Sequence, residues 1–252
     1  MLDLANNSCA LLIGVDDYSD YDAGKTLKGS VNDVAAWFRV CRALHLDPRN
    51  IRVLVTRTLD DEGKLRADLP VGRFPAGTTV LEATHDNILD GVRWLADRLS
   101  TGNAPGLLTY SGHGDSMPDG ELALCPKDVT PSKDGAGVDK LIGLSEIGDI
   151  LGGKLARRLL TVVLDCCQGG VSPREGSTSL ALRPKGPPAQ SYLVRPGARI
   201  LYACQPGQTA VQSEFTSQFH GAFTWALTAA LLQWKPVAQG GAVQLDLSYG
   251  KA

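Results

Sequence analysis

Two stretches of the sequence place a reactive side chain among glycines directly after an apolar run. Residues 107–115 (LLTYSGHGD) contain His113, and residues 160–170 (LTVVLDCCQGG) contain Cys167. A thiol becomes a strong nucleophile only as the thiolate, and a neighbouring imidazole can take its proton. Flanking glycines let the backbone approach a substrate closely and present N–H groups to an oxyanion. These residue types therefore predict thiol-based acyl transfer by a His113–Cys167 dyad.

The two apolar runs predict buried strands, whose side chains alternate between the faces of a sheet. If the alternation continues past the strand ends, Asp165 and Cys167 share one face and Cys166 lies on the other. By the same count Ser111 and His113 share a face. We therefore expect Cys167, His113, Asp165 and Ser111 to meet on one side, with Cys166 as a packed neighbour. Reaction at Cys166 is the alternative.

The elements that must position these residues follow from the hydrophobic pattern of the whole chain. Buried strands are expected over 10–15, 51–55, 106–110, 159–164 and 199–203. Stretches of helical period lie at 32–44, 85–99, 145–151 and 221–234. Such alternation is typical of crossover units, so we predict an α/β fold, a three-layer αβα sandwich around a mainly parallel sheet of about six strands. Ligands bind beyond the carboxyl ends of such strands, where both motifs lie.

Composition and charge exclude several classes of protein. The 252 residues are 43% hydrophobic and 21% charged, which is typical of a globular chain. The balance of 25 basic and 27 acidic residues leaves a net charge of −2, so nucleic acid and membrane surfaces are not expected partners. No apolar run approaches the ~20 residues of a membrane span, and no signal peptide pattern is present. We therefore expect a cytoplasmic protein whose six cysteines are free thiols without zinc spacing.

Five short motifs, in order along the chain, resemble those of the caspase-like cysteine peptidases, most of all the metacaspases and their bacterial relatives. They are LKGSVND at 27–33, YSGHG at 110–114, DCCQGG at 165–170, ACQPGQT at 203–209 and GAFT at 221–224. The spacing of 54 residues between His113 and Cys167 is similar to that in caspases. The resemblance runs from about residue 10 to 234.

This resemblance implies a single caspase-like peptidase domain over 1–252. It implies Cys167 as the nucleophile, His113 as the general acid and base, and the N–H groups of Gly114 and Cys167 as the oxyanion hole. It also implies a specificity pocket formed by Asp33, Ser111, Asp165 and Ser30, the last in place of a cysteine. Two carboxylates in a shielded pocket favour a cationic side chain, so we predict cleavage after Arg or Lys through a thioacyl intermediate. The alternatives are a catalytically silent adaptor and a caspase with Asp specificity.

Residues 171–197 are rich in proline and glycine, lack periodicity and are too long for an ordinary loop. They separate a large portion, about 1–170, from a small portion, about 198–252. Because caspase relatives are often cut at this place, we expect self-processing at Arg174, Arg183, Lys185 and Arg195. A flexible substrate-binding loop is the alternative. The chain ends soon after a stretch at 242–248 that we interpret as a strand, which indicates a fragment of a longer protein.

The resemblance also leads to expectations about metals and partners. Many metacaspases carry a long acidic insertion after the histidine as part of a calcium site, which is reduced here to Asp115, Asp119, Glu121 and Asp128. We expect no metal and no cofactor, and calcium activation is the alternative. An acidic run at 16–22 lacks EF-hand spacing and predicts a solvated loop. His220 belongs to no motif and is expected on the surface or in a helix. The expected partners are a protein or peptide substrate and a regulatory or activating protein, in a bacterial defence role.

Overall fold

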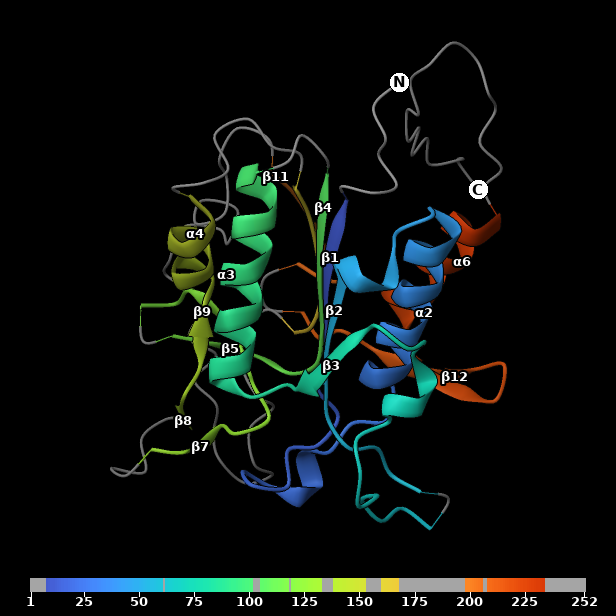
Figure 1. Cartoon of the computed structure of the whole chain (residues 1–252). Coiled ribbons are helices and arrows are strands. Elements are labelled where there is room, and N and C mark those ends of the chain that lie inside the picture. Colours follow the sequence, from blue (N-terminus) through green and yellow to red (C-terminus); the bar gives the residue numbers. More distant parts are fainter. Residues whose placement is uncertain are drawn as a thin grey trace.

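The computed structural model describes residues 8–60, 62–101, 105–117, 119–132, 138–152, 160–167, 198–205 and 208–233. Its centre is a six-stranded parallel sheet with the strand order β11-β10-β4-β1-β2-β3. These strands are β1 (Cys9–Gly14), β2 (Ile51–Val55), β3 (Thr79–Glu82), β4 (Gly106–Ser111), β10 (Leu160–Asp165) and β11 (Ala198–Tyr202). Helices cover both faces of the sheet (Figure 1), which confirms the predicted three-layer α/β fold.

Four longer helices form the outer layers, two on each face (Figure 1). They are α2 (Ser30–Ala43) with α6 (Ala222–Gln233), and α3 (His85–Thr101) with α4 (Leu144–Gly152). Helix α3 shows why they form where they do, because Ile88, Val92, Leu95 and Leu99 recur at helical spacing and are at most 1% exposed. Short 3-10 turns occur at η1 (Ala23–Lys25), η2 (Pro48–Asn50) and η3 (Val71–Arg73).

The sheet separates two apolar cores, and side chains of each central strand alternate between them. On β10, Val162 and Leu164 join the core on the α3 and α4 side, whereas Val163 joins the core on the α2 and α6 side. Strand β4 lies beside β10 in register, with Ser111 opposite Asp165. The two predicted chemical motifs therefore emerge side by side at one edge of the sheet, as expected from parallel strands.

Smaller antiparallel elements follow the central strands. After β4, strands β5 (Gly114–Ser116), β6 (Leu122–Leu124) and β9 (Ile142–Gly143) form a three-stranded sheet. Strands β7 (Thr130–Pro131) and β8 (Val138–Asp139) pair with each other. The hairpin of β12 (Gln212–Phe215) and β13 (Gln218–Gly221) leads directly into α6. None of these elements was predicted from the sequence.

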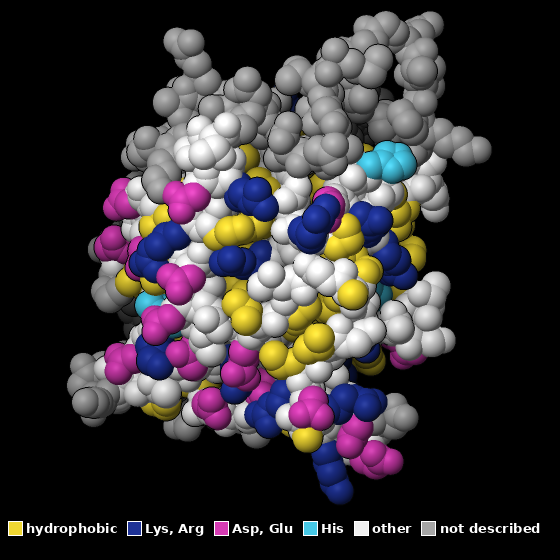
Figure 2. Space-filling view, viewed as in Figure 1, with side chains coloured by type: hydrophobic (Ala, Val, Ile, Leu, Met, Phe, Trp, Pro, Cys, Tyr) yellow, Lys and Arg dark blue, Asp and Glu magenta, His cyan; other side chains and the backbone are white. Residues whose placement is uncertain are grey.

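The surface in Figure 2 carries acidic and basic side chains interspersed with apolar ones, without a large field of one sign on this face. That distribution agrees with the nearly balanced charge of the sequence. In the described ranges no helix combines the length and apolar character needed to cross a membrane. The predicted processing loop at 171–197 with its four basic sites, and the predicted strand at 242–248, lie outside the described residues.

Candidate active site

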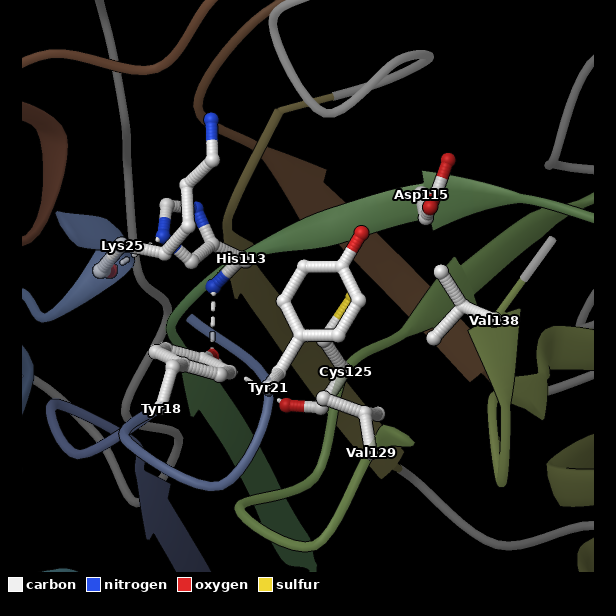
Figure 3. Close-up of a pocket in the computed structure, with 8 residues that line it drawn as sticks. All are labelled: Tyr18, Tyr21, Lys25, His113, Asp115, Cys125, Val129 and Val138. Carbon is white, nitrogen blue, oxygen red and sulfur yellow. Dashed lines mark hydrogen bonds between the residues drawn. The ribbon is translucent and has the colours of Figure 1, made fainter. Parts of the chain in front are cut away.

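The backbone of His113, just beyond the end of β4, is fixed by two buried tyrosines, Tyr18 and Tyr110. Figure 3 shows the hydrogen bond to the first of them. The His113 N–H donates to the Tyr18 hydroxyl oxygen at 2.8 Å, and its carbonyl accepts from the Tyr110 hydroxyl at 2.7 Å. Both tyrosines are 1% exposed. The Tyr18 ring also packs on the imidazole, with 4.7 Å between the ring centroids. Because the phenols cannot move far within the core, they hold the histidine loop in one conformation.

The protonation of the His113 ring follows from its partner. Its Nε2 lies 2.7 Å from the carbonyl oxygen of Lys25, at the end of η1. A carbonyl only accepts hydrogen bonds, so Nε2 carries the hydrogen and Nδ1 is left with a lone pair in the neutral ring. Burial lowers the pKa of His113. The imidazole is therefore a neutral base that presents Nδ1.

The two adjacent cysteines occupy different environments. Cys166 is 2% exposed and packs in the same core as Tyr110, and burial raises its pKa well above the ordinary value of a thiol. Cys167 is partly exposed. This difference is the one that the strand alternation predicts. The geometry favours Cys167 as the reactive thiol, because Cys166 is both covered and held protonated.

The histidine and cysteine loops run against each other. The N–H of Gly112 donates to the Asp165 carbonyl at 3.3 Å. A Cβ atom at Gly114 would overlap the carbonyl oxygen of Cys167 and lie 3.2 Å from Cys166 Sγ, so only glycine allows this approach. The structure thus brings the predicted catalytic segments together. Among the described residues there is no hydrogen bond between the His113 ring and the Cys167 thiol, so contact within the dyad remains a prediction.

The N–H of Gly114 is available for the predicted oxyanion hole. Gly114 pairs with Leu124 across β5 and β6, and at the preceding position the Cys125 N–H donates to the His113 carbonyl at 3.2 Å. Hydrogen-bonded and non-hydrogen-bonded pairs alternate along an antiparallel ladder. Gly114 therefore belongs to a non-hydrogen-bonded pair, and its N–H points away from β6.

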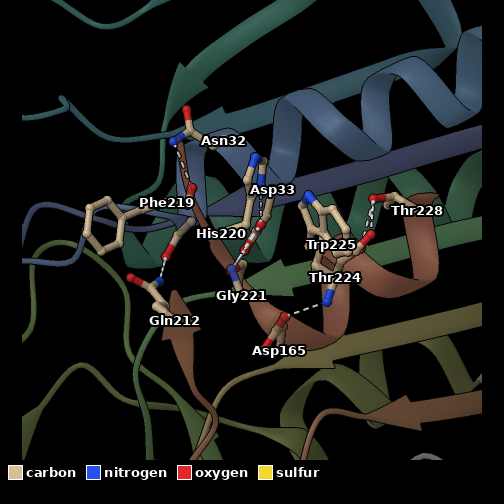
Figure 4. Close-up of polar contacts among 12 residues, drawn as sticks. Asn32, Asp33, Asp165, Gln212, Phe219, His220, Gly221, Thr224, Trp225 and Thr228 are labelled. Carbon is tan, nitrogen blue, oxygen red and sulfur yellow. Dashed lines mark hydrogen bonds and ion pairs between the residues drawn. The ribbon is translucent and has the colours of Figure 1, made fainter. Parts of the chain in front are cut away.

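Two predicted pocket acids converge near the start of α6 (Figure 4). Asp33, in the first turn of α2, is 0% exposed and accepts from the Ser111 hydroxyl at 2.6 Å and from the Gly221 N–H at 3.1 Å. Asp165 is 5% exposed and accepts from the Thr224 N–H at 2.9 Å, in the first turn of α6. The partial positive charge of a helix N-terminus stabilises a carboxylate at this position.

The close approach of the two acids depends on Gly221. A Cβ atom there would overlap Asp165 Oδ2 and lie 3.0 Å from Asp33 Oδ2. Burial raises the pKa of Asp33 to about 7, and the charge of Asp165 adds to this effect. Burial also raises the pKa of Asp165. The site is thus a shielded pair of carboxylates.

Ser30, the fourth predicted pocket residue, lies in the first turn of α2 and is 0% exposed. Its hydroxyl oxygen accepts from Gln212 Nε2 at 3.2 Å, and its N–H donates to Asp16 at 2.8 Å.

The prediction of a solvated loop at 16–22 is wrong for Asp16 and Asp17, which are at most 1% exposed. Asp16 caps α2, and Asp17 forms an ion pair with Arg57 at 2.8 Å.

The acidic residues predicted as a calcium remnant are engaged elsewhere. Asp119 accepts from the Glu121 N–H at 3.0 Å, and Glu121 accepts from the Ser145 hydroxyl at 2.8 Å. Asp128 forms an ion pair with Lys140 at 2.8 Å. In the part of the chain that the structure describes, no three His, Cys, Asp or Glu side chains group together as metal ligands would.

The site therefore joins a neutral histidine held by its neighbours, a partly exposed cysteine and a pair of buried carboxylates at one sheet edge. A family model described as "Caspase domain" matches residues 7–240. The chain belongs to the caspase domain family. Membership indicates cysteine-type peptidase chemistry in general. A search of curated proteins found no match to the sequence.

Two partners within this caspase domain escaped sequence reasoning. The Lys25 contact uses a backbone carbonyl, which any residue supplies, so the sequence carries no signal for it. His220, expected on the surface or in a helix, is instead 3% exposed on β13 and bonds to Asp33. Its position directly before the GAFT motif was the only available signal.

Proposed function

We propose that this caspase domain is a cysteine endopeptidase that cleaves proteins after Arg or Lys. The observation that carries the proposal is the state of His113, a neutral ring whose Nε2 is anchored on the Lys25 carbonyl and whose Nδ1 is free to take a proton. This base lies at the sheet edge where the partly exposed Cys167 follows β10. The fold and the family support the same chemistry.

In the acylation step, His113 Nδ1 takes the thiol proton of Cys167 and the sulfur attacks the scissile carbonyl carbon. The negative charge on the carbonyl oxygen is stabilised by the N–H groups of Gly114 and Cys167. The imidazolium then gives its proton to the leaving amine as the C–N bond breaks, which leaves a thioester. Throughout this cycle the Lys25 carbonyl retains the hydrogen on Nε2 and so keeps the ring oriented.

In the deacylation step, His113 accepts a proton from water as the water oxygen attacks the thioester carbon. Collapse of the second tetrahedral intermediate breaks the C–S bond. The sulfur leaves as a thiolate, takes the proton back from the imidazolium, and the new carboxyl terminus departs. No group other than the dyad, the backbone donors and water is required.

Specificity for a cation follows from the acidic pocket. Asp33 and Asp165 are buried beside each other, with Ser111 bonded to the former. A substrate aspartate would add a third carboxylate to this pair, and like charges in a shielded site repel strongly. An arginine or lysine side chain instead supplies the missing positive charge. This argument favours metacaspase-like over caspase-like specificity.

The proposal is tested with matched fluorogenic peptides that end in Arg, Lys or Asp. Wild type, Cys167→Ala and Cys166→Ala are compared with and without calcium. We expect Arg or Lys cleavage that is lost only in Cys167→Ala and is insensitive to calcium. Cleavage after Asp would contradict the pocket assignment. Absence of cleavage by wild type under all conditions would instead support a silent adaptor.

Self-processing is a separate part of the proposal. Arg174, Arg183, Lys185 and Arg195 have the side chains that an acidic pocket accepts. Mass spectrometry of purified wild type and Cys167→Ala, stored side by side, should show cuts after these residues only in wild type. An intact wild type with full peptidase activity would argue against processing.

A further inference from the structure

The peptide bond between Cys166 and Cys167 contains one of the two N–H groups expected to bind the oxyanion. Among the described residues nothing accepts a hydrogen bond from the Cys167 N–H. In a trans peptide the C=O and N–H groups lie in one plane and point in opposite directions. The group that holds the Cys166 carbonyl oxygen therefore sets the direction of the Cys167 N–H.

The backbone hydrogen bonds between β10 and β11 stop just before this carbonyl. The last of them runs from the Ala203 N–H to the Leu164 carbonyl at 3.0 Å. In a parallel ladder the next donor on the same strand lies two residues on, so the Gln205 N–H would be expected on the Cys166 carbonyl. It donates instead to the side-chain oxygen of Gln208 at 2.9 Å. The ladder thus leaves the Cys166 carbonyl without its usual backbone partner.

The Cys204 thiol takes the place of that backbone donor. Its Sγ lies 3.3 Å from the Cys166 carbonyl oxygen and 3.4 Å from the Gln208 carbonyl oxygen. A thiol carries one hydrogen and a carbonyl only accepts, so Cys204 is the donor and the two carbonyls share it. Gln205 and Gln208 are joined by two further hydrogen bonds, which anchor the backbone on the far side of Cys204. The thiol thus extends the contact between β10 and β11 by one hydrogen bond.

The same segment is contacted from the β4 side by Gly114. A Cβ atom at Gly114 would overlap the Cys167 carbonyl oxygen and lie 3.2 Å from Cys166 Sγ. Strand β10 lies between β4 and β11 in the sheet, so the two residues that follow it are flanked from both sides. Among the described residues the Cys204 thiol is the only hydrogen-bond donor to their two carbonyls. Gly114 therefore limits the space for this segment, and Cys204 fixes the rotation of its peptide plane.

We propose that Cys204 is a positioning residue of the oxyanion hole: its S–H group holds the Cys166 carbonyl and so aims the Cys167 N–H at the oxyanion. A peptide whose carbonyl accepts a hydrogen bond is polarised, which also makes its own N–H a stronger donor. Cys204 acts through this peptide and touches neither the substrate nor the reacting atoms. The inference rests on the proposed function, because an oxyanion forms only if the protein is a peptidase.

The hydrogen bond is tested without any turnover by nuclear magnetic resonance. Two cysteines are adjacent only at 166 and 167, so a protein labelled with ¹³C and ¹⁵N in cysteine alone gives one signal that correlates an amide with the preceding carbonyl. Cys204→Ala removes the donor, whereas Cys204→Ser keeps an O–H group. We expect the Cys166 carbonyl signal to move upfield in Cys204→Ala and to stay closer to wild type in Cys204→Ser. An unmoved signal in Cys204→Ala, or an equal shift in both variants, would overturn the proposal.

The consequence for catalysis is tested with the same pair of variants and an Arg peptide. Loss of a whole oxyanion donor costs about 10²–10³ in rate, so a donor that is present but turned should cost less, about tenfold in kcat. KM should stay unchanged, because the oxyanion exists only in the transition state. We expect Cys204→Ser to return kcat to within about threefold of wild type. A loss confined to KM, or an equal loss of kcat in both variants, would contradict the positioning role.

Thermal unfolding checks that each variant folds, and if Cys204→Ala does not, Cys204→Val fills the space of the thiol without a donor and replaces it in both experiments. The proposed function is judged separately, from cleavage by wild type. A wild type that cleaves no peptide would refute the peptidase, and the carbonyl signal would still decide whether Cys204 orients this peptide bond. Cleavage after Arg together with an unmoved signal in Cys204→Ala would do the reverse.

Discussion

At the scale of single residues, the candidate site depends on side chains that fix a backbone rather than touch a substrate. Tyr18 accepts from the His113 N–H, contacts its ring and donates to the Cys125 carbonyl at 3.1 Å. One buried phenol thus joins the loop after β1 to the loop after β4. The chemistry expected of His113 requires its ring to be held within a narrow range of orientations.

Removal of the Tyr18 hydroxyl should therefore impair both stability and activity. In Tyr18→Phe the His113 N–H loses its acceptor, and an unpaired buried donor costs roughly 1–3 kcal/mol. We expect a fall of about that size in the free energy of unfolding and at least a tenfold lower kcat/KM for Arg peptides. Urea unfolding and peptide cleavage measure the two effects. Tyr202→Phe is the control, because the Tyr202 hydroxyl has no hydrogen-bond partner among the described residues, and equal kcat/KM in the two variants would contradict the role of Tyr18.

The pH profile of activity should report the environment of His113. Protonation of the ring abolishes the base, and burial lowers its pKa below the ordinary 6.5. As pH falls, kcat/KM for an Arg peptide should therefore decline with a midpoint below 6.5. A midpoint at or above 6.5 in wild type would show that the ring is not held in the neutral form.

At the scale of elements, the site is made by two loops that leave adjacent parallel strands and touch at Gly114. The contact between Gly114 and the Cys167 carbonyl is possible only without a Cβ atom. The strand ends determine where the loops begin, and this glycine determines how near they come. Small changes here should consequently affect geometry more than folding.

Gly114→Ala tests this contact. The added methyl group would overlap the Cys167 carbonyl and push the two loops apart, which displaces the N–H expected to bind the oxyanion. Loss of one oxyanion donor costs about 10²–10³ in rate, so kcat should fall by at least about 100-fold. Gly72→Ala is a matched control, because a Cβ atom there has no neighbour within 4 Å. A Gly114→Ala enzyme with near wild-type kcat would exclude a functional role for this approach.

The central strands and helices could be predicted because buried segments consist of apolar residues, and this pattern is visible in the sequence. Apolar runs gave β2 its bounds and placed β1, β4, β10 and β11 within a residue or so. Strand β3 (Thr79–Glu82) lacks this signal, since it lies at the sheet edge and alternates between exposed and half-buried residues. The hairpin of β12 and β13 turns at Thr216 and Ser217 with positive φ, where glycine or asparagine would have been expected.

The site could be predicted from the sequence only where the residues that act together lie close to one another along the chain. The motifs around His113 and Cys167 carry their own glycines and strands, so their meeting at one edge follows from the parallel topology. The partnership of Asp33 with His220 spans 187 positions and joins a helix to a hairpin that the sequence did not reveal. Contacts of this kind depend on how loops fold back, which periodicity does not describe.

At the scale of the whole molecule, the edge of the sheet where the catalytic segments meet also contains buried carboxylates. Asp16, Asp33 and Asp165 are at most 5% exposed, and burial raises the pKa of each above the ordinary 3.8. Removing a carboxylate from water disfavours its charged form. We therefore expect these buried aspartates to contribute most of the pH dependence of the free energy of unfolding.

The free energy of unfolding should therefore fall as pH rises from about 4 toward 7. Between the unfolded pKa of 3.8 and the native pKa of about 7, Asp33 retains a proton that the unfolded chain has released, which contributes up to about 1.4 kcal/mol per pH unit, and the raised pKa values of Asp16 and Asp165 act in the same direction. His113 opposes this trend below pH 6.5, because burial lowers its pKa, but it is one group against three. Urea unfolding at pH 5, 6 and 7 should show a decreasing midpoint, and Asp33→Asn should make the decrease shallower. A midpoint that rises over this range would mean that these carboxylates are ionised in the native state and that the acidic pocket is more strongly charged than its burial implies.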